Sequence, residues 1–519
     1  MPDFSDYVRT LAGAEAKTGS ASWPAAAVLW AQVVELNPVV GHHWVRLAEA
    51  RFELGDYGGA LAAYGTAQEA GVWLHRDEIE AVFPAEIAYR MATCHVRRGD
   101  REGAVRELRR ALRLGLRDLG RPKSDEHWEP LLGDEAVREM LGIIDTTGMT
   151  RDEGWRADLA FLAREIKRRA YAPAATRRRA RVRPAGRGQR GRAAGPAGQV
   201  LPVQRGAVRD RGRRGLPPGD RSTGAERDGH PVDEVLAAVE PLISRDNDQQ
   251  VRWLGPDLLR WTSLIHALGL ISDPRQATLT VRFPDQTTGT VTVESAADLR
   301  SRVTDPRPAG WISLPGTVGA PMPLYLRNSD TPYWFEYLPA EAVVYFQFNG
   351  VGDQPLEPIA AFCERLFTFI DNHQVSKLVI DLRWNGGGNT YLVQPLLHRL
   401  IGCSKINQRG CLYVIIGRGT FSAAQNTATA IERETNAIFV GEPSGSRPNF
   451  IGEVSPFTLP YSKASVNVAD LYWQTSWPTD HRPWIAPELY APPSFEAYSH
   501  NRDPAMEAIL SCREHPPGW

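Results

Sequence analysis

The first 118 residues carry apolar side chains at helical spacing, interrupted by short polar turns. In residues 37–67, two such apolar series flank the turn Gly55-Asp56-Tyr57. Their members are Trp44, Leu47, Ala48 and Phe52 before the turn, and Ala60, Tyr64 and Ala67 after it. Spacings of three and four residues place each series on one face of a helix, so the segment is predicted to form a helix-turn-helix unit.

The helix-turn-helix unit recurs along this part of the chain. A weaker copy occupies residues 85–112 around the turn Arg98-Gly99-Asp100, and a half-copy runs through residues 24–38. The unit resembles the tetratricopeptide repeat, whose copies stack into a solenoid. This resemblance implies an all-α solenoid over residues 1–118 that offers a surface to a peptide or a protein partner. An array that only packs on the rest of the chain is the alternative.

Residues 119–173 are predicted to form connecting and cap helices. Within them, residues 151–171 read as one amphipathic helix. Its apolar positions fall on one face of the helix. The residues of that face are Trp155, Leu159, Leu162 and Ile166.

The pattern is lost in residues 174–228, where fifteen arginines stand among glycine, alanine and proline. This stretch has no aromatic residue, isoleucine, methionine or lysine, a composition that cannot bury a core. Three interpretations stay open. The stretch is an ordinary flexible linker, an arginine-rich linker that contacts RNA or phosphate, or an out-of-frame translation of a GC-rich gene. Regular patterning returns at Gly229-His230-Pro231.

Residues 332–512 alternate short apolar runs with helical segments of ten or more residues. The runs lack polar alternation, which is typical of parallel strands covered on both faces. We therefore expect an α/β core, preceded by a β-rich segment over residues 229–331. The predicted strands are 343–349, 377–382, 411–417 and 437–442, and the predicted helices are 356–370 and one from about residue 392.

The composition changes this picture little. A chain of 519 residues exceeds one core, and 42% hydrophobic and 23% charged residues are ordinary for soluble globular domains. The formal net charge of −1 gives no overall attraction to nucleic acid or to an anionic membrane. Five scattered cysteines without a Cys-x-x-Cys pair argue against a disulfide framework and a structural zinc site. Neither a signal peptide nor an apolar run of membrane-spanning length is visible, so a cytoplasmic location is expected.

Two turns of the α/β segment combine residues suited to acyl transfer. One predicted strand ends in Asn385-Gly386-Gly387-Gly388, where backbone N–H groups are unobstructed by side chains. Another strand turns into a helix at Thr420-Phe421-Ser422-Ala423-Ala424. A serine that opens a helix most often caps it, and a glycine turn is most often only a turn. A hydroxyl beside two convergent N–H groups, however, is what nucleophilic attack on a carbonyl requires.

Order and spacing turn these separate signals into a resemblance. The segments LVIDLRWNGGGN (378–389), GTFSAAQ (419–425) and FVGEPSGSRPN (439–449) resemble the S41 family of serine peptidases, which includes C-terminal processing proteases and the tricorn core. The resemblance covers about residues 332–510 and extends weakly to 155–171 and 229–243, where a degenerate peptide-binding module is expected. It implies a crotonase-like α/β core, hydrolysis of peptide bonds, and no metal or organic cofactor.

The resemblance assigns roles by position. Ser422 becomes the nucleophile, and the N–H groups of Ala423 and of Gly387 or Gly388 become the oxyanion hole. The supporting residues are Asp381, Arg383 and Asn385, which would scaffold the glycine turn, and Glu442, which would support the neighbouring loop.

The general base breaks the family pattern. Processing proteases use a lysine about twenty-five residues after the serine, and Arg447 occupies that place here. A guanidinium stays protonated, so Arg447 would instead bind a carboxylate of a substrate or of the protein. The tricorn-like branch uses a histidine from the cap region with an acidic partner, for which Asp480 and Glu488 are candidates. The expected Gly-x-x-His turn would fall in the arginine-rich stretch, which lacks it, and His230 is a weak substitute.

These patterns predict a multidomain protein with a tetratricopeptide-like solenoid followed by an α/β peptidase core. The leading hypothesis is a serine peptidase acting on a peptide or protein substrate, impaired unless a base is supplied. The alternative is a catalytically impaired scaffold that binds peptides through its repeats and its former cleft.

Overall fold

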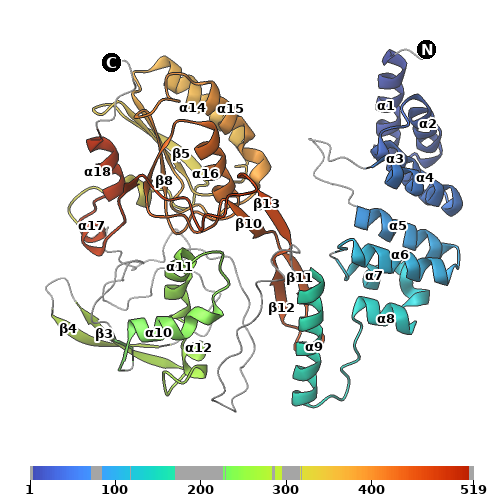
Figure 1. Ribbon diagram of the computed structural model, residues 1–519, viewed down its shortest axis with the longest axis horizontal. Helices are drawn as coiled ribbons and strands as arrows, with labels where there is room; N and C mark the ends of the chain where they lie inside the picture. The colour runs from blue at the N-terminus through green and yellow to red at the C-terminus, as the bar shows by residue number, and fades with distance from the viewer. Residues whose placement is uncertain are drawn as a thin grey trace. The chain divides into compact units, whose positions relative to one another are not determined.

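The computed structural model describes residues 4–71, 84–116, 118–169, 226–227, 229–282, 287–294, 316 and 318–512. These residues belong to two compact units (Figure 1). Unit 1 joins Met1–Val182 to Glu453–Asp470, and unit 2 joins Arg183–Gly452 to Leu471–Trp519. All but two residues of the arginine-rich stretch 174–228 lie outside the described residues. The three interpretations of this stretch therefore concern residues that the structure does not describe.

Unit 1 is a series of helices with one β-hairpin. Its helices pair in sequence, α1 with α2, α3 with α4 and α5 with α6. The elements are α1 (Phe4–Gly19), α2 (Trp23–Leu36), α3 (Gly41–Glu53), α4 (Tyr57–Ala70), α5 (Pro84–Arg97), α6 (Arg101–Arg113), α7 (Arg121–Ser124), η1 (Glu126–Leu131), α8 (Glu135–Leu141), α9 (Arg151–Arg169), β11 (Ser455–Thr458) and β12 (Ser465–Val468).

The Gly-Asp turns have a direct structural cause. Gly55 and Gly99 adopt φ values of 78° and 72°, which a residue with a side chain rarely takes. Each is followed by an aspartate that caps the next helix. The Asp56 carboxylate accepts the Gly59 N–H at 2.8 Å. The equivalent bond from the Gly103 N–H to Asp100 measures 2.9 Å. In each turn the glycine therefore ends one helix, and the aspartate after it caps the next.

The predicted repeats are confirmed and extended by one helix. Leu47, Ala48 and Tyr64 are buried in one core with the other small residues of α3 and α4. Helix α1 completes the half-copy seen in the sequence, because the indole N–H of Trp30 in α2 donates to Thr18 Oγ1 at 2.8 Å. Residues 4–19 did not stand out in the sequence, since their polar residues are as numerous as their apolar ones.

The predicted helix α9 is present, but the apolar face of its sequence is not its buried face. Leu159 is 62% exposed and Ile166 is 43% exposed. The buried positions are Gly154, Asp158, Phe161, Glu165 and Arg169. This face meets the hairpin β11–β12, whose backbone and turn offer polar groups that only polar side chains can satisfy.

Unit 2 begins with a small α/β part. Its four-stranded sheet has the order β2-β1-β3-β4, and Val235, Val239, Ile265 and Ile271 form its core. The elements are β1 (Glu226–Arg227), β2 (His230–Pro231), α10 (Val232–Val239), η3 (Glu240–Leu242), α11 (Gln249–Leu258), α12 (Thr262–Ala267), β3 (Gln276–Arg282) and β4 (Thr288–Glu294).

The rest of unit 2 is built on a six-stranded sheet of order β14-β9-β8-β7-β6-β5. Five strands are parallel, and β5 pairs antiparallel with β6. A two-stranded sheet, β10 with β13, lies beside it. The elements are η4 (Leu324–Leu326), β5 (Tyr333–Leu338), β6 (Val343–Phe348), α14 (Ile359–Asn372), β7 (Lys377–Asp381), η5 (Thr390–Val393), α15 (Gln394–Gly402), β8 (Leu412–Ile416), α16 (Ala423–Glu434), β9 (Ile438–Gly441), β10 (Asn449–Gly452), β13 (Leu471–Gln474), β14 (Leu489–Tyr490), α17 (Phe495–Ser499) and α18 (Pro504–Ser511).

Helices cover both faces of the sheet, which explains its uniformly apolar strands. Side chains of α14, α15 and α16 pack on one face, and those of α18 pack on the other (Figure 1). Every residue of β6, β8 and β9 is buried. The predicted fold class, an all-α repeat region with an α/β core, is confirmed. The antiparallel β5–β6 hairpin was not predicted, because Pro332–Leu338 has no helix before it to mark a β-α-β unit.

Candidate active site

The glycine turn after β7 is held by the side chain of Asn385. Its amide nitrogen donates to Phe348 O at 3.0 Å, and its Oδ1 accepts the Gly387 N–H at 2.9 Å. Gly388 is wedged against Val351, because a Cβ on Gly388 would lie 1.9 Å from the Val351 carbonyl oxygen. Gly387 and Gly388 adopt φ values of 114° and 137°, so both positions favour glycine.

The turn after β8 is joined to the glycine turn by buried hydrogen bonds. The Thr420 hydroxyl donates to Leu382 O at 2.9 Å and accepts the Gly417 N–H at 3.1 Å. The Phe421 N–H donates to Asn385 O at 3.1 Å. These bonds fix the residue that follows Phe421 against the glycines.

Ser422 occupies this fixed position in a strained conformation. Its φ of 55° and ψ of −126° lie outside the regions that residues with a side chain normally adopt. Such backbone strain costs about 1–3 kcal/mol and persists only where the surrounding structure enforces it. Ser422 makes no side-chain capping bond to α16, so it is not the helix cap that a serine at this place usually is.

The Ser422 hydroxyl lies beside the glycine turn and a free backbone amide. A Cβ placed on Gly387 would lie 3.0 Å from Ser422 Oγ and 3.0 Å from Ala423 N. Ala423 is the first residue of α16, where an N–H has no partner inside the helix. Within the described part of the chain, neither Ser422 Oγ nor the Ala423 N–H has a hydrogen-bond partner.

The two glycines differ as oxyanion donors. The Gly387 N–H is occupied by Asn385 Oδ1, whereas the Gly388 N–H has no acceptor among the described residues. Of the two alternatives that the sequence left open, the geometry therefore favours Gly388 as the partner of Ala423. The positive end of the α16 dipole lies at the Ala423 N–H, the first amide of that helix.

A buried ionic network anchors the start of the glycine turn. The Arg383 guanidinium donates to both oxygens of Asp503 at 2.9 Å and to Asp381 at 3.0 Å. Burial alone lowers the pKa of Arg383, but the Asp381 and Asp503 charges overcome it and raise the pKa well above its usual value. The Tyr345 hydroxyl donates to Asp381 at 2.6 Å, and burial and the Asp381 charge raise the pKa of Tyr345. Among the described residues, no hydrogen bond joins this network to Ser422.

The two residues predicted on the following loop are engaged in ion pairs. Glu442 is buried and binds the Arg418 guanidinium through both oxygens. Arg447 binds Asp246, whose carboxylate also accepts the Arg447 N–H at 2.7 Å. The loop from 443 to 449 is thus held by residues 246–250 of the small α/β part. Arg447 pairs with a carboxylate of the protein, one of the two uses that the sequence left open.

Neither candidate acidic partner holds a histidine. Asp480 accepts bonds from Arg482 and from the Ser476 hydroxyl, and these lower the pKa of its carboxyl far below the usual value. Glu488 pairs with Arg409 at 2.5 Å. His230 pairs with Glu234, and no histidine of the described residues bonds to Ser422. The general base is therefore not found within the described part of the chain.

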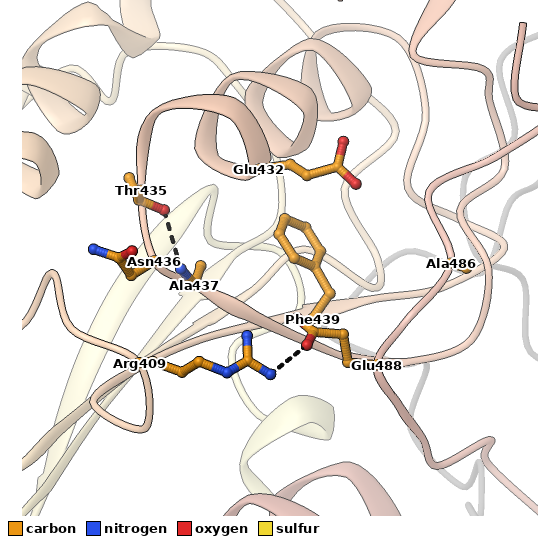
Figure 2. A pocket seen from close by; sticks show the side chains of 8 residues that line it. All are labelled: Arg409, Glu432, Thr435, Asn436, Ala437, Phe439, Ala486 and Glu488. Atoms are coloured by element: carbon orange, nitrogen blue, oxygen red, sulfur yellow. Dashed lines mark hydrogen bonds and ion pairs between the residues drawn. The ribbon is translucent and has the colours of Figure 1, made fainter. Parts of the chain in front are cut away.

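A pocket of about 360 Å³ lies elsewhere in unit 2. Figure 2 shows Glu432 and Thr435 on its rim, at the C-terminal end of α16, with the Arg409–Glu488 ion pair at its base. A helix rises about 1.5 Å per residue, so the length of α16 separates this hollow from Ser422. No group of acidic, histidine or cysteine side chains arranged to hold a metal occurs among the described residues.

Three residues that support the site were not predicted from the sequence. Thr420 was quoted only as part of a motif, although its hydroxyl links the two turns. Asp503 caps α18 and pairs with Arg383, and the Asp-Pro that starts this helix was its only visible signal. Asp246 had no signal, because its partner Arg447 lies 201 residues away in the chain.

Comparisons with known proteins give partial structural likeness only. No family model matches the sequence, and no curated protein matches it. Mature CPAF is 13% identical with a TM-score of 0.36, covering 60% of this chain and 80% of its own. The photosystem II D1 C-terminal processing protease is 16% identical with a TM-score of 0.26, covering 45% of this chain and 58% of its own.

The helical repeats have their own structural neighbours. PcrH in complex with the chaperone binding region of PopD is 15% identical with a TM-score of 0.19, covering 27% of this chain and 90% of its own. At these scores the likeness carries no statement about activity. The neighbours of this chain thus include S41-type processing proteases and tetratricopeptide-like chaperones, the two kinds of protein that its sequence resembles.

Proposed function

We propose that the protein is a serine-type hydrolase of peptide bonds with Ser422 as its nucleophile. The observation that carries the proposal is the conformation of Ser422, a strained residue whose hydroxyl is left unbonded beside the glycine turn and the free Ala423 N–H. Strand-to-helix turns of this strained kind expose nucleophilic serines in other hydrolase folds. A serine kept only for structure would cap α16, and this one does not.

The chemistry follows from the geometry. Ser422 Oγ attacks the carbonyl carbon of the scissile bond, and the carbonyl oxygen takes the negative charge. The Ala423 and Gly388 N–H groups donate to that oxygen, and each such donor contributes about 10²–10³ in rate. Asp381, Arg383 and Asn385 hold the glycine turn, while Glu442, Arg447 and Asp480 hold the neighbouring loops. The hydroxyl proton needs an acceptor from outside the described residues.

A fluorophosphonate probe tests this proposal directly. We expect wild-type protein to be labelled at Ser422, because the probe's phosphoryl oxygen occupies the oxyanion position and fluoride leaves. Peptide mapping by mass spectrometry locates the label. Ser422→Ala should remove it, while Ser404→Ala, a change at an exposed serine, should leave it intact. Labelling that persists in Ser422→Ala would contradict the assignment.

A peptide-binding scaffold is the second candidate function. It is favoured by one observation, that Ser422 has no histidine, lysine or carboxylate partner among the described residues. In this case the wild-type protein takes no label, yet the repeats still recruit a protein partner as their sequence resemblance implies. Binding of a peptide without labelling would distinguish the scaffold from the hydrolase.

A further inference from the structure

The sheet formed by β10 and β13 has one aromatic face. Phe450 lies directly opposite Trp473, and Gly452 lies opposite Leu471. Residues opposite each other, and residues two apart on a strand, point to the same side of a sheet. Both rings fold over Gly452, since a Cβ there would lie 2.8 Å from the Phe450 ring and 2.9 Å from the Trp473 ring.

This face adjoins the residues that surround Ser422. The Phe450 ring packs against Phe421, the residue before the serine, with centroids 6.4 Å apart. The Trp473 ring packs against Tyr391, with centroids 6.3 Å apart. Tyr391 follows the proposed oxyanion donor Gly388 by three residues. The same face therefore contacts the turn that carries the nucleophile and the segment that follows the glycines.

Asn426 keeps this arrangement in place. Its side-chain nitrogen donates to Thr390 Oγ1 at 3.0 Å, and its oxygen accepts the Thr475 hydroxyl at 2.7 Å. Thr390 begins η5, Asn426 belongs to α16, and Thr475 follows β13. One buried amide thus ties together the three elements that carry Tyr391, Ser422 and Trp473.

The face is apolar and partly open to solvent. Tyr391 is 70% exposed and Leu471 is 39% exposed. We call Tyr391, Phe450, Leu471 and Trp473 the aromatic face. None of its members carries a charge. Exposed apolar surface next to a reactive group is typical of a binding subsite rather than of a bare surface.

We propose that the aromatic face binds a large apolar side chain of the substrate, on the residue whose carbonyl Ser422 attacks. The attacked residue would lie at Ser422. Phe421, which precedes Ser422, and Tyr391, three residues after Gly388, pack on the rings of this face. The continuity of this face with Ser422 identifies the bound group. A substrate residue whose carbonyl lies at Ser422 carries its side chain next to the rings. This inference rests on the proposed hydrolase function and adds its substrate preference.

Two aminoalkyl diphenyl phosphonates of identical reactive group test the preference. One carries a benzyl side chain and the other a methyl side chain at the position that mimics the attacked residue. Ser422 Oγ forms a bond to phosphorus, one phosphorus–oxygen bond breaks, phenolate leaves, and the hydroxyl proton passes to buffer. The labelling rate with each probe, corrected for its hydrolysis in buffer, gives a benzyl-to-methyl ratio. A fluorophosphonate without such a side chain reports the reactivity of Ser422 alone.

Matched variants separate the aromatic face from general effects. Tyr391→Ala is compared with Tyr490→Ala, a change at a tyrosine of similar exposure, 67%, on the edge strand β14. Leu471→Ser is compared with Ile451→Ser, a change at a residue 40% exposed on the opposite face of the same two strands. Because the four side chains are exposed, their loss should not prevent folding.

We expect a benzyl-to-methyl ratio of about tenfold or more in the wild type. Tyr391→Ala and Leu471→Ser should lower the ratio at least threefold, while Tyr490→Ala and Ile451→Ser leave it unchanged. A ratio near one, or a ratio that survives Tyr391→Ala, would overturn this inference while the fluorophosphonate still labels Ser422. Failure of the fluorophosphonate itself would overturn the proposed function, and the preference with it.

Discussion

At the scale of single residues, the three consecutive glycines after β7 answer different demands. Nothing lies within 4 Å of a Cβ placed on Gly386, and its φ is not positive. A Cβ on Gly387 would lie 2.6 Å from the Cβ of Ser422. A Cβ on Gly388 would collide with the carbonyl of Val351. Only the second and third glycines therefore touch the site.

Alanine substitutions along this triplet should follow that order. We expect Gly386→Ala to keep the rate of fluorophosphonate labelling within about threefold of the wild type. Gly387→Ala should displace the serine, and Gly388→Ala should misplace an oxyanion donor, so each should lower the rate at least about 100-fold. Circular dichroism checks that the fold survives. Equal losses of labelling rate in all three variants would show that the substitutions disrupt the turn as a whole rather than the site.

Local chemistry at the site was predictable, and long-range partners were not. Ser422 and the glycines lie in short segments whose residue types predict a turn and the start of a helix. The bond from Gly387 to Asn385 and the ion pair of Arg447 depend on the folded chain. Sequence spacing therefore brought Ser422 and the glycine turn to one proposed site but could not choose between Gly387 and Gly388.

At the scale of elements, α9 and the hairpin β11–β12 of unit 1 are joined by hydrogen bonds and by ring packing. The buried Asp158 carboxylate accepts the Tyr461 N–H at 2.7 Å and the Ser462 N–H at 2.9 Å. Phe161 packs on Phe457, with centroids 5.9 Å apart. Gly154 lets the Tyr461 ring lie directly on the helix backbone. The hairpin thus fits α9 by shape as well as by hydrogen bonding.

Two glycine-to-alanine changes in helices should have opposite effects. A Cβ on Gly154 would lie 2.3 Å from the Tyr461 ring, so Gly154→Ala should weaken hairpin docking by about 1–3 kcal/mol. Hydrogen exchange at the Tyr461 and Ser462 amides measures this loss. Nothing lies within 4 Å of a Cβ on Gly65 in α4, so Gly65→Ala should stabilise by about 0.5–1 kcal/mol.

Unchanged exchange in Gly154→Ala would contradict the described joint. Thermal unfolding followed by circular dichroism supplies the comparison for Gly65→Ala, because helix propensity alone predicts a gain at both positions. A gain in stability for Gly154→Ala as well would mean that the Tyr461 ring moves aside without weakening the docking of the hairpin.

The same joint explains why the apolar face of α9 is not its buried face. Periodicity identifies the apolar stripe of a helix, and Leu159 and Ile166 lie on that stripe. The hairpin instead requires acceptors for its turn amides, which Asp158 provides, and Glu165 binds Arg169 within the joint. A polar interface between distant segments leaves no period of its own, whereas the repeats and the parallel strands do.

At the scale of the whole chain, the general base is the missing part. The described residues place Ser422 beside the glycine turn and the Ala423 N–H, but they offer Ser422 no proton acceptor. The stretch 174–228 stands where the resemblance expects a histidine. Its composition, rich in arginine and free of lysine and aromatic residues, is typical of a GC-rich gene read out of frame.

The nucleotide sequence across codons 170 to 230 tests this interpretation. We expect one of the other two frames to encode a patterned segment with a histidine after a glycine-rich turn. Restoring that frame should raise the labelling rate of Ser422 by about 10²–10⁴, the usual contribution of a general base. If no other frame is patterned, the stretch is a genuine linker and the scaffold gains support.

The hairpin of unit 1 also constrains the order in which the chain can mature on the ribosome. Asp158 emerges 303 residues before the Tyr461 amide that it binds. At 5–20 residues per second, this delay lasts about 15–60 s. During that time the repeats can fold, but Phe161 and the buried charged residues of α9 are not yet covered by the hairpin. Nascent chains that stall before residue 453 should therefore be the species that chaperones engage.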